Sequence, residues 1–361
     1  MKITISLLTY FISISILTSQ NYTLVTGLDS AVEETSGLLY LNNTLITNND
    51  SGNTNQLFDI NTSDGTIART ITIPNASNID WEDLAYDDNY IYIAEIGNNL
   101  GSRTDLKIYR ISRSDYFNNT SVIAEIINYS YSDQTDFTPS PFATNFDAEA
   151  LIHLNNKLYI FTKNWIDAKT NIYELSKTPG TYTAILIDTI DSQGLITGAS
   201  YNNTNGNIML CGYDGLGSFL LQLSGFSNGI FSNGTLLKTA ITPPTNYSQQ
   251  TEGIASLNTD EYYVSAEKVS SDLHGLYSFN VSTLTDSEMS NNQISFYPNP
   301  AKTELMINKE DCTTKIYTLT GELILTTSNS KINISDLSKG VYLIKIKDSY
   351  NGYLIKRLVI D

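Results

Sequence analysis

The segment Asp147-Ala148-Glu149-Ala150-Leu151 opens the clearest copy of the repeat that decides the fold of this chain. Each copy begins with acidic or polar residues, continues through a small and an aliphatic residue, and then enters an apolar run that a turn interrupts. The third position of the motif falls, in the five copies, at Ser36, Glu82, Glu149, Gly198 and Glu252. By subtraction these positions lie 46, 67, 49 and 54 residues apart, which is near the period of about 40–50 residues of a propeller blade.

Each copy is expected to form four antiparallel strands. In the third copy the strands are predicted at residues 151–154, 157–162, 171–175 and 183–190, with Asn155-Asn156 as a tight turn between the first two. The frequent Tyr, Thr, Ile and Asn residues and the lack of a sustained 3.6-residue apolar period favour strands throughout.

The fifth copy ends before a fourth strand, and an unused strand-forming segment, Tyr22–Thr26, lies near the start of the chain. We expect that segment to supply the missing outer strand, because closing the ring removes exposed sheet edges. The chain is thus predicted to be all-β, with a five-bladed β-propeller over residues 21–285, a linker at 286–293 and a small β-sandwich over 294–361. A six-bladed ring is the alternative, if the insertion at 133–145 hides a degenerate blade.

The first residues have the pattern of a secretory signal peptide, which we predict over residues 1–20. Lys2 precedes an apolar run from Ile3 to Leu17, and small polar residues follow that run. The run is shorter than the roughly 20 apolar residues of a membrane span. No other apolar run is long enough to cross a bilayer, so no transmembrane segment is expected once the signal is removed.

Charge is unevenly distributed along the chain, whose net charge is −17. Residues 292–361 hold 9 Lys and Arg and 7 Asp and Glu, a net charge of +2, which leaves −19 for residues 1–291. So acidic a body repels phosphate backbones, and we therefore expect no nucleic-acid partner. The two cysteines, Cys211 and Cys312, lie in different predicted domains, so no disulfide framework is expected.

The topology of a propeller predicts a cluster of acidic side chains at one mouth of its central channel. The first strand of each blade lines the channel and the second runs back beside it, so the start of one and the end of the other meet. A Ca²⁺ ion, which takes six to eight oxygen ligands, would neutralise carboxylates gathered there. The predicted metal ligands are Asp80, Glu82, Asp147, Glu149, Glu252, Glu95 and Glu267. Further carbonyl oxygens are available from Asn48, Asn49, Asn98 and Asn164. The alternative is that these acids accept N–H bonds and cap turns between blades.

Aromatic and basic side chains near the same loop ends are the predicted ligand contacts, namely Trp81, Trp165, Lys163 and Tyr213. Aromatic faces beside carboxylates suit a carbohydrate or another small molecule, and ordinary packing between blades is the alternative. No catalytic residue is predicted. The histidines, His153 and His274, form no metal-binding set, and the Gly225–Gly229 segment, which has the letters of a serine-hydrolase elbow, joins two predicted strands.

The last part of the chain contains three characteristic segments: Tyr297-Pro298-Asn299-Pro300-Ala301, the central motif at residues 332–342, and a C-terminal segment, Lys356–Ile360, that begins with two basic residues. This pattern resembles the type A C-terminal sorting domain of cargo that the type IX secretion system exports in Bacteroidetes-type bacteria. The resemblance implies recognition by the secretion machinery, removal of the domain by a surface peptidase, and a destination in the medium or at the outer-membrane surface.

The repeat itself, through Glu82, Glu149 and Glu252, resembles the phytase-like, strictosidine-synthase-like and gluconolactonase-like propellers, which often place a Glu at the start of inner strands. That resemblance implies an association with calcium. The first and fourth copies depart from it, because Ser36 and Gly198 occupy the Glu position.

Two functions follow as hypotheses. The first is a secreted or surface-displayed binding or adhesion protein whose acidic mouth binds Ca²⁺, and the missing catalytic set favours it. The alternative is a Ca²⁺-dependent hydrolase of the phytase-like or lactonase-like kind, in which the ion polarises an ester or phosphoryl oxygen and Glu149 or Asp147 acts as base.

Removal of the residues from Tyr297 onward is expected to leave the first domain folded but held in the periplasm, because the tail carries the export signal. Cell fractionation measures the location, and resistance of the trapped protein to protease distinguishes a folded from a misfolded cargo. Delivery of the truncated protein to the medium or the cell surface would refute the assignment of the tail.

Overall fold

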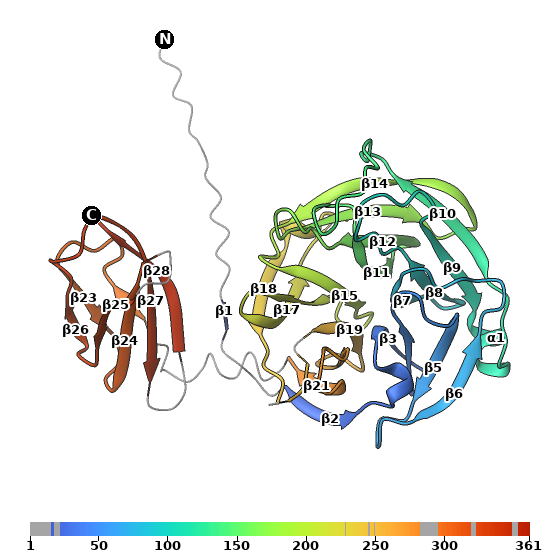
Figure 1. Cartoon of the computed structure of the whole chain (residues 1–361), viewed down its shortest axis with the longest axis horizontal. Coiled ribbons are helices and arrows are strands. Elements are labelled where there is room, and N and C mark those ends of the chain that lie inside the picture. Colours follow the sequence, from blue (N-terminus) through green and yellow to red (C-terminus); the bar gives the residue numbers. More distant parts are fainter. Residues whose placement is uncertain are drawn as a thin grey trace, which may run out of the picture. The chain divides into compact units, whose positions relative to one another are not determined.

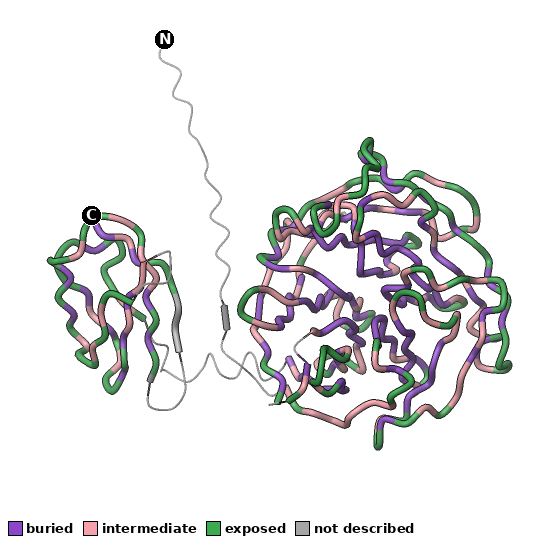
Figure 2. The backbone as a smooth tube through the Cα atoms, in the orientation of Figure 1, coloured by how far each residue is buried: buried purple, intermediate pink, exposed green. Residues whose placement is uncertain are grey.

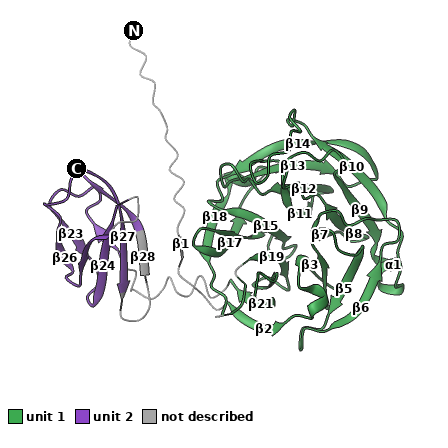
Figure 3. Ribbon diagram, in the orientation of Figure 1, with its two compact units in different colours: residues 1–281 green, residues 282–361 purple. Residues whose placement is uncertain are grey.

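A computed structural model describes residues 16–17, 22–227, 229–244, 246–248, 250–281, 295–318, 323–348 and 353–361. The chain divides into two compact units, Met1–Val281 and Ser282–Asp361 (Figure 3). Apart from β1 (Ile16–Leu17), which pairs in parallel with β18, the predicted signal peptide lies outside the described residues. The predicted linker at 286–293 lies wholly outside them.

The chain is all-β, as predicted, and the sheets of the first unit follow the copies of the repeat. The first copy forms one antiparallel sheet from β3 (Thr35–Leu41), β4 (Thr44–Asn49), β5 (Gln56–Ile60) and β6 (Ile67–Thr72). The fourth copy forms another from β15 (Leu195–Tyr201), β16 (Ile208–Asp214), β17 (Gly217–Ser224) and β18 (Thr235–Ala240). Short helices lie between strands: η1 (Ser30–Val32), α1 (Arg113–Asn118) and η2 (Phe231–Asn233).

The fifth copy contains β19 (Thr251–Ser256), β20 (Glu261–Ala266) and β21 (Gly275–Asn280). The strand β2 (Thr23–Gly27), from the start of the chain, pairs antiparallel with β21 and completes this sheet. The prediction that the early segment supplies the missing outer strand is therefore confirmed.

The second and third copies share one eight-stranded sheet, which the sequence did not predict. The second copy contributes β7 (Trp81–Tyr86), β8 (Tyr90–Glu95), β9 (Lys107–Ser112) and β10 (Glu125–Tyr131). The third contributes β11 (Ala148–Leu154), β12 (Lys157–Thr162), β13 (Thr170–Ser176) and β14 (Gly180–Ile190). The long β14 joins the two halves, because its second part pairs antiparallel with β13 and its first part pairs in parallel with β10.

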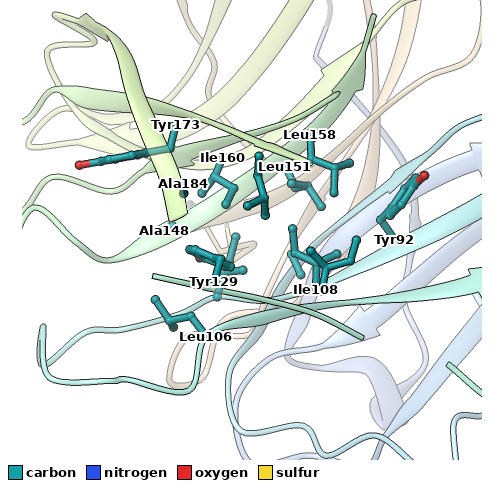
Figure 4. Close-up of a cluster of buried hydrophobic side chains, with 14 of the residues drawn as sticks. Tyr92, Leu106, Ile108, Tyr129, Ala148, Leu151, Leu158, Ile160, Tyr173 and Ala184 are labelled. Atoms are coloured by element: carbon teal, nitrogen blue, oxygen red, sulfur yellow. The ribbon is translucent and has the colours of Figure 1, made fainter. Parts of the chain in front are cut away.

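The sheets of the first unit have a circular arrangement, with the first strand of each copy nearest the centre (Figure 1). These innermost strands adjoin in a closed circuit, from β3 to β7, β11, β15 and β19, and back to β3. Figure 2 shows that their backbone is mostly buried. Apolar side chains fill the space between neighbouring copies. The cluster of Tyr92, Ile108, Leu158 and Ile160 (Figure 4) lies between the two halves of the eight-stranded sheet, and such burial is the main stabilising contribution.

Each innermost strand has a register shift at the same point of the repeat. Pairing with the second strand is interrupted between Thr35 and Leu38, Trp81 and Leu84, Ala148 and Ala150, Ile196 and Gly198, and Thr251 and Gly253. Such β-bulges re-aim side chains. The third position of the motif falls within the shift in four copies. In the fourth copy the residue within the shift is Thr197, one position before Gly198, because regular pairing resumes at Gly198.

Close approach of the innermost strands explains the glycines beside these shifts. A Cβ atom on Gly198 would lie 2.3 Å from the carbonyl oxygen of Glu252, and one on Gly253 would lie 2.4 Å from that of Ser36. The hydroxyls at the shifts also connect strands, because Ser36 Oγ donates to the Glu82 carbonyl and Thr197 Oγ1 to the Thr251 carbonyl, both at 2.6 Å.

Asp83 joins three innermost strands through one fully buried carboxylate. Its Oδ1 accepts the backbone N–H of Leu84 at 2.8 Å, and its Oδ2 accepts those of Leu151 on β11 at 2.8 Å and Ala199 on β15 at 3.2 Å. Burial raises the pKa of Asp83 well above its ordinary value, and the three N–H donors oppose that rise.

The second unit consists of two sheets around one apolar cluster that includes Leu305, Ile316, Ile344, Leu358 and Ile360. One sheet contains β22 (Phe296–Tyr297), β23 (Glu304–Ile307) and β26 (Lys331–Asn333). The other contains β25 (Leu323–Thr327), β24 (Cys312–Tyr317), β27 (Gly340–Asp348) and β28 (Tyr353–Ile360). Cys211 and Cys312 are both buried, and neither forms a disulfide within the described residues. Within the described residues, no helix combines the length and apolarity that crossing a membrane requires.

Replacement of Asp83 by Asn is expected to lower the free energy of unfolding by about 3 kcal/mol. The amide keeps only one acceptor oxygen, and its NH₂ group cannot accept, so at least one of the buried backbone N–H groups loses its acceptor. Urea denaturation measures the effect. The matched change Asp88→Asn, at an exposed position in the turn between β7 and β8, should alter stability by no more than about 0.5 kcal/mol. Equal midpoints for the two variants would contradict the role assigned to Asp83.

Candidate functional site

Three carboxylates converge where the start of β7 meets the end of β4. Asp50 directly follows β4, Asp80 directly precedes β7, and Glu82 occupies the register shift of β7. One oxygen from each lies within 4.8 Å of the others. We call Asp50, Asp80 and Glu82 the carboxylate cluster. The sequence predicts Asp80 and Glu82 as metal ligands, whereas Asp50 is not among the predicted ligands.

Gly97 leaves the space in which this cluster fits. A Cβ atom at that position would lie 2.1 Å from Glu82 Oε1 and 2.4 Å from the carboxyl carbon of Asp80. Its backbone N–H donates to the Asp80 carbonyl at 3.2 Å, which fixes the loop after β8 against the start of β7. The glycine in Glu95-Ile96-Gly97 was the available signal for this close approach, and sequence reasoning missed it.

Burial keeps protons on the cluster near neutral pH. It raises the pKa of Asp50 to about 6, and it raises that of Asp80, beside Asp50 and Asp147, to about 7. Burial together with the neighbouring Glu149 raises the pKa of Glu82 well above its ordinary value. The three groups therefore bind either protons or a cation, because their ionised forms repel one another in a site with little water.

Lys163 is the internal counter-ion of the mouth. Its Nζ lies 2.9 Å from Glu149 Oε1, and both side chains are buried. The same nitrogen lies 5.0 Å from the ring centre of Trp165 and 5.3 Å from that of Tyr213. Burial disfavours the charged amine, but Glu149 and Glu252 outweigh it and hold the pKa of Lys163 well above its ordinary value.

Asp147 already has a full set of partners. It accepts the backbone N–H of Asn98 at 2.6 Å and the indole N–H of Trp165 at 2.8 Å, and burial raises its pKa. Glu95 is likewise occupied, because it accepts the N–H groups of the two residues before Trp81 and pairs with Arg103 at 2.6 Å. For these two acids the geometry matches the predicted alternative, in which carboxylates cap turns.

Other acceptors around the mouth have fewer hydrogen bonds within the described residues. Glu252 Oε2 is buried and has no hydrogen bond within the described part of the chain, and burial, opposed by Lys163, raises the pKa of this residue to about 7. Glu267 accepts the amide of Gln250, and burial beside Glu252 raises its pKa to about 8. Asn48 Oδ1 is also buried and unpartnered, while its Nδ2 donates to the Trp81 carbonyl at 3.2 Å.

Of the predicted ligand contacts, Trp165 and Tyr213 are half-buried at this mouth, and Lys163 lies between them. The prediction that Trp81 meets a ligand is wrong. Trp81 is fully buried in the apolar cluster between the first two sheets, and its indole N–H donates to the Ser77 carbonyl at 2.9 Å.

The other end of the innermost strands has a different character. A groove of about 270 Å³ lies there, lined by uncharged side chains that include Tyr40, Asn42, Tyr86 and Asn203. His153 lines the neighbouring end of the channel, with Nε2 4.0 Å from Asp87. His153 and the carboxylate cluster therefore lie at opposite ends of the innermost strands.

Comparison with known proteins assigns the tail. Residues 295–361 match the family described as the secretion system C-terminal sorting domain. The chain is therefore cargo of the type IX secretion system, whose machinery its C-terminal domain engages, and a secreted or cell-surface protein of a Bacteroidetes-type bacterium. No curated protein matches the chain.

Solved structures show similarity at low identity. The chain is similar to PorZ, a surface component of the type IX secretion system of Porphyromonas gingivalis, at 15% identity and a TM-score of 0.31 over 91% of this chain. It spans only 45% of PorZ. It is also similar to the aldose sugar dehydrogenase of Streptomyces coelicolor, at 12% identity and a TM-score of 0.38 over 74% of this chain and 97% of that one. A third similarity is to an α-L-arabinofuranosidase of Podospora anserina, at 8% identity and a TM-score of 0.43 over 73% and 98%.

The stability of the cation-free protein is expected to fall as the pH rises from about 4 to about 8. Across this window the folded state holds protons on Asp80, Glu252 and Glu267, whose pKa values are raised to about 7, 7 and 8, whereas the unfolded state has released them. Denaturation in chelator at a series of pH values measures the slope. Glu267→Gln should flatten the upper end of the curve, and stability that rises across the window would contradict these assignments.

Proposed function

We propose that the protein is a secreted or cell-surface binding protein whose first unit is a five-bladed β-propeller with a Ca²⁺ ion at its acidic mouth. One observation carries this proposal: three carboxylates from two neighbouring sheets converge within 4.8 Å beside buried acceptors that lack partners. A carbohydrate or another small molecule that reaches this mouth would meet the ion together with Trp165 and Tyr213.

The count of five blades rests on the closed circuit of innermost strands. The eight-stranded sheet contains two of them, β7 and β11, one at each edge, and so corresponds to two blades joined through their outer strands. The insertion at 133–145, which is described throughout, contributes no strand, and this supports five blades over six.

The chemistry of the donors favours a hard divalent cation. The cluster offers carboxylate oxygens. Within the described residues, Glu252 Oε2 and the amide oxygens of Asn48 and Asn49 are further buried acceptors without a hydrogen bond. Such an all-oxygen set suits Ca²⁺, which accepts irregular geometry and completes its shell with water. In this proposal Asp50, Asp80 and Glu82 hold the ion, with the other predicted acids around it.

Binding is preferred to hydrolysis because the two predicted bases are occupied. Glu149 is paired with Lys163, and both oxygens of Asp147 accept hydrogen bonds from Asn98 and Trp165. A general base must reach the proton that it removes. Neither carboxylate is free to do so without breaking a buried contact.

Addition of Ca²⁺ to the chelator-treated protein is expected to raise the melting temperature in a dose-dependent way. When the free Ca²⁺ concentration is one hundred times the dissociation constant, the free energy of unfolding should be higher by about 2.7 kcal/mol. The shift should be lost in Glu82→Gln and in Asp80→Asn, because each removes a ligand charge. The control Asp115→Asn, at an exposed position on α1, should keep the full shift. A shift that survives both cluster variants would place the ion elsewhere.

A further inference from the structure

Exposed apolar side chains gather on the face that contains the acidic mouth. Among the described residues of the first unit, eight large exposed apolar side chains lie in the connections at that end of the innermost strands: Ile79, Leu100, Phe137, Phe142, Ile166, Leu216, Val269 and Leu273. The turns at the opposite end of the innermost strands have none, and these turns are at residues 42–43, 87–89, 155–156, 202–207 and 257–260.

We call four side chains from adjoining connections the apolar platform: Leu100, Phe142, Trp165 and Ile166. The connections that contain Leu100 and Phe142 adjoin because the N–H of Ser140 donates to the Leu100 carbonyl at 2.9 Å, and Ile166 directly follows Trp165. Phe142 and Trp165 pack edge to face with ring centres 4.9 Å apart. Phe142 and Ile166 are 61% and 67% exposed, values at which a large apolar side chain is in contact with water over most of its surface.

The platform is held in place by its backbone. The N–H of Phe142 donates to the Asn99 carbonyl at 3.0 Å, and that of Trp165 donates to the Thr144 carbonyl at 3.1 Å. Phe142 has a φ of 52°, a left-handed conformation that a bulky residue rarely adopts and that costs free energy. The insertion at 133–145 therefore presents the ring outward from a fixed position.

The platform borders negative charge. The indole of Trp165 donates to Asp147 at the edge of the mouth, and the exposed acids Asp136 and Asp167 belong to the same connections as Phe142 and Ile166. Two cations lie in the same connection, and each faces an acid: the buried Lys163 lies 2.9 Å from Glu149, and the half-buried Lys169 lies 4.0 Å from Asp167. A partner that covers the platform thus meets apolar surface flanked by carboxylates.

We infer that the apolar platform is a docking surface for a polypeptide segment in which large apolar side chains alternate with Lys or Arg. The apolar side chains would bury Phe142 and Ile166, and the basic side chains would reach Asp136, Asp167 and the rim of the mouth, so that both chemistries contribute. This inference rests on the proposed binding function but not on the Ca²⁺ ion, because none of the platform residues belongs to the carboxylate cluster.

The test uses the full chain and three synthetic peptides of equal length. One alternates Phe and Leu with Lys and Arg, the second replaces its basic residues with Glu, and the third replaces its apolar residues with Ser. Trp165 reports binding through its fluorescence, because the other tryptophan, Trp81, is fully buried. The first peptide should bind at least tenfold more tightly than either of the others.

The variants Phe142→Ser and Ile166→Ser should each weaken binding of the first peptide at least tenfold. Calorimetry measures the variants, and Ile123→Ser is the matched control because Ile123 is also 67% exposed but lies outside the platform. Both platform variants should keep the Ca²⁺-dependent melting shift, so a failure of the docking surface is distinguishable from a failure of the proposed ion site.

Equal binding by the platform variants and the wild type would overturn the inference. Binding of phosphatidylcholine vesicles but not of the peptide, lost in Phe142→Ser, would overturn it in favour of a membrane surface.

Discussion

The register shift that recurs in every innermost strand is the constraint on which the rest of the first unit depends. It interrupts strand pairing at equivalent points of β3, β7, β11, β15 and β19. A bulge turns a side chain away from the regular alternation of a strand. Where the shifted residue is Ser or Thr, its hydroxyl bonds to the next innermost strand, and where it is Glu, a carboxylate is buried at the mouth. One backbone irregularity thus both connects the sheets and concentrates the charge.

In the absence of a bound cation, this concentration of carboxylates destabilises the folded state. Burying an ionised carboxylate is costly unless it is paired, and Lys163 pairs directly with only one of the acids, Glu149. Asp147 and Glu95 are satisfied by N–H donors or by Arg103, whereas Glu252 retains an unpartnered oxygen. The pKa values of Asp80, Glu82, Glu252 and Glu267 are raised because these buried acids have too few partners for their ionised forms. A bound cation would remove it, so occupancy of the proposed site and stability of the fold are linked.

The sequence predicted the features that periodicity and composition control. The repeat indicated the positions of the strands, the closing role of Tyr22–Thr26, and the convergence of Asp80 and Glu82 at one mouth. Features that depend on how strands pair and pack in the folded protein could not be predicted from the sequence. The register shifts themselves were not predicted, and in the fourth copy the shift falls at Thr197, one position before the third position of the motif. The burial of Trp81 was missed because its neighbours in sequence are polar. The parallel pairing of β10 with β14, and the three-strand role of Asp83, involve residues too far apart in sequence for any local pattern to indicate.

The most direct test of the central claim is an anomalous-scattering experiment on crystals of the protein grown with Mn²⁺ in place of Ca²⁺. A cation at the acidic mouth predicts one strong peak bonded to oxygens of Asp50, Asp80 and Glu82, in the space that Gly97 leaves open. Crystals that contain well-ordered carboxylates at this mouth but no peak between them, or a peak only at some other place, would contradict it.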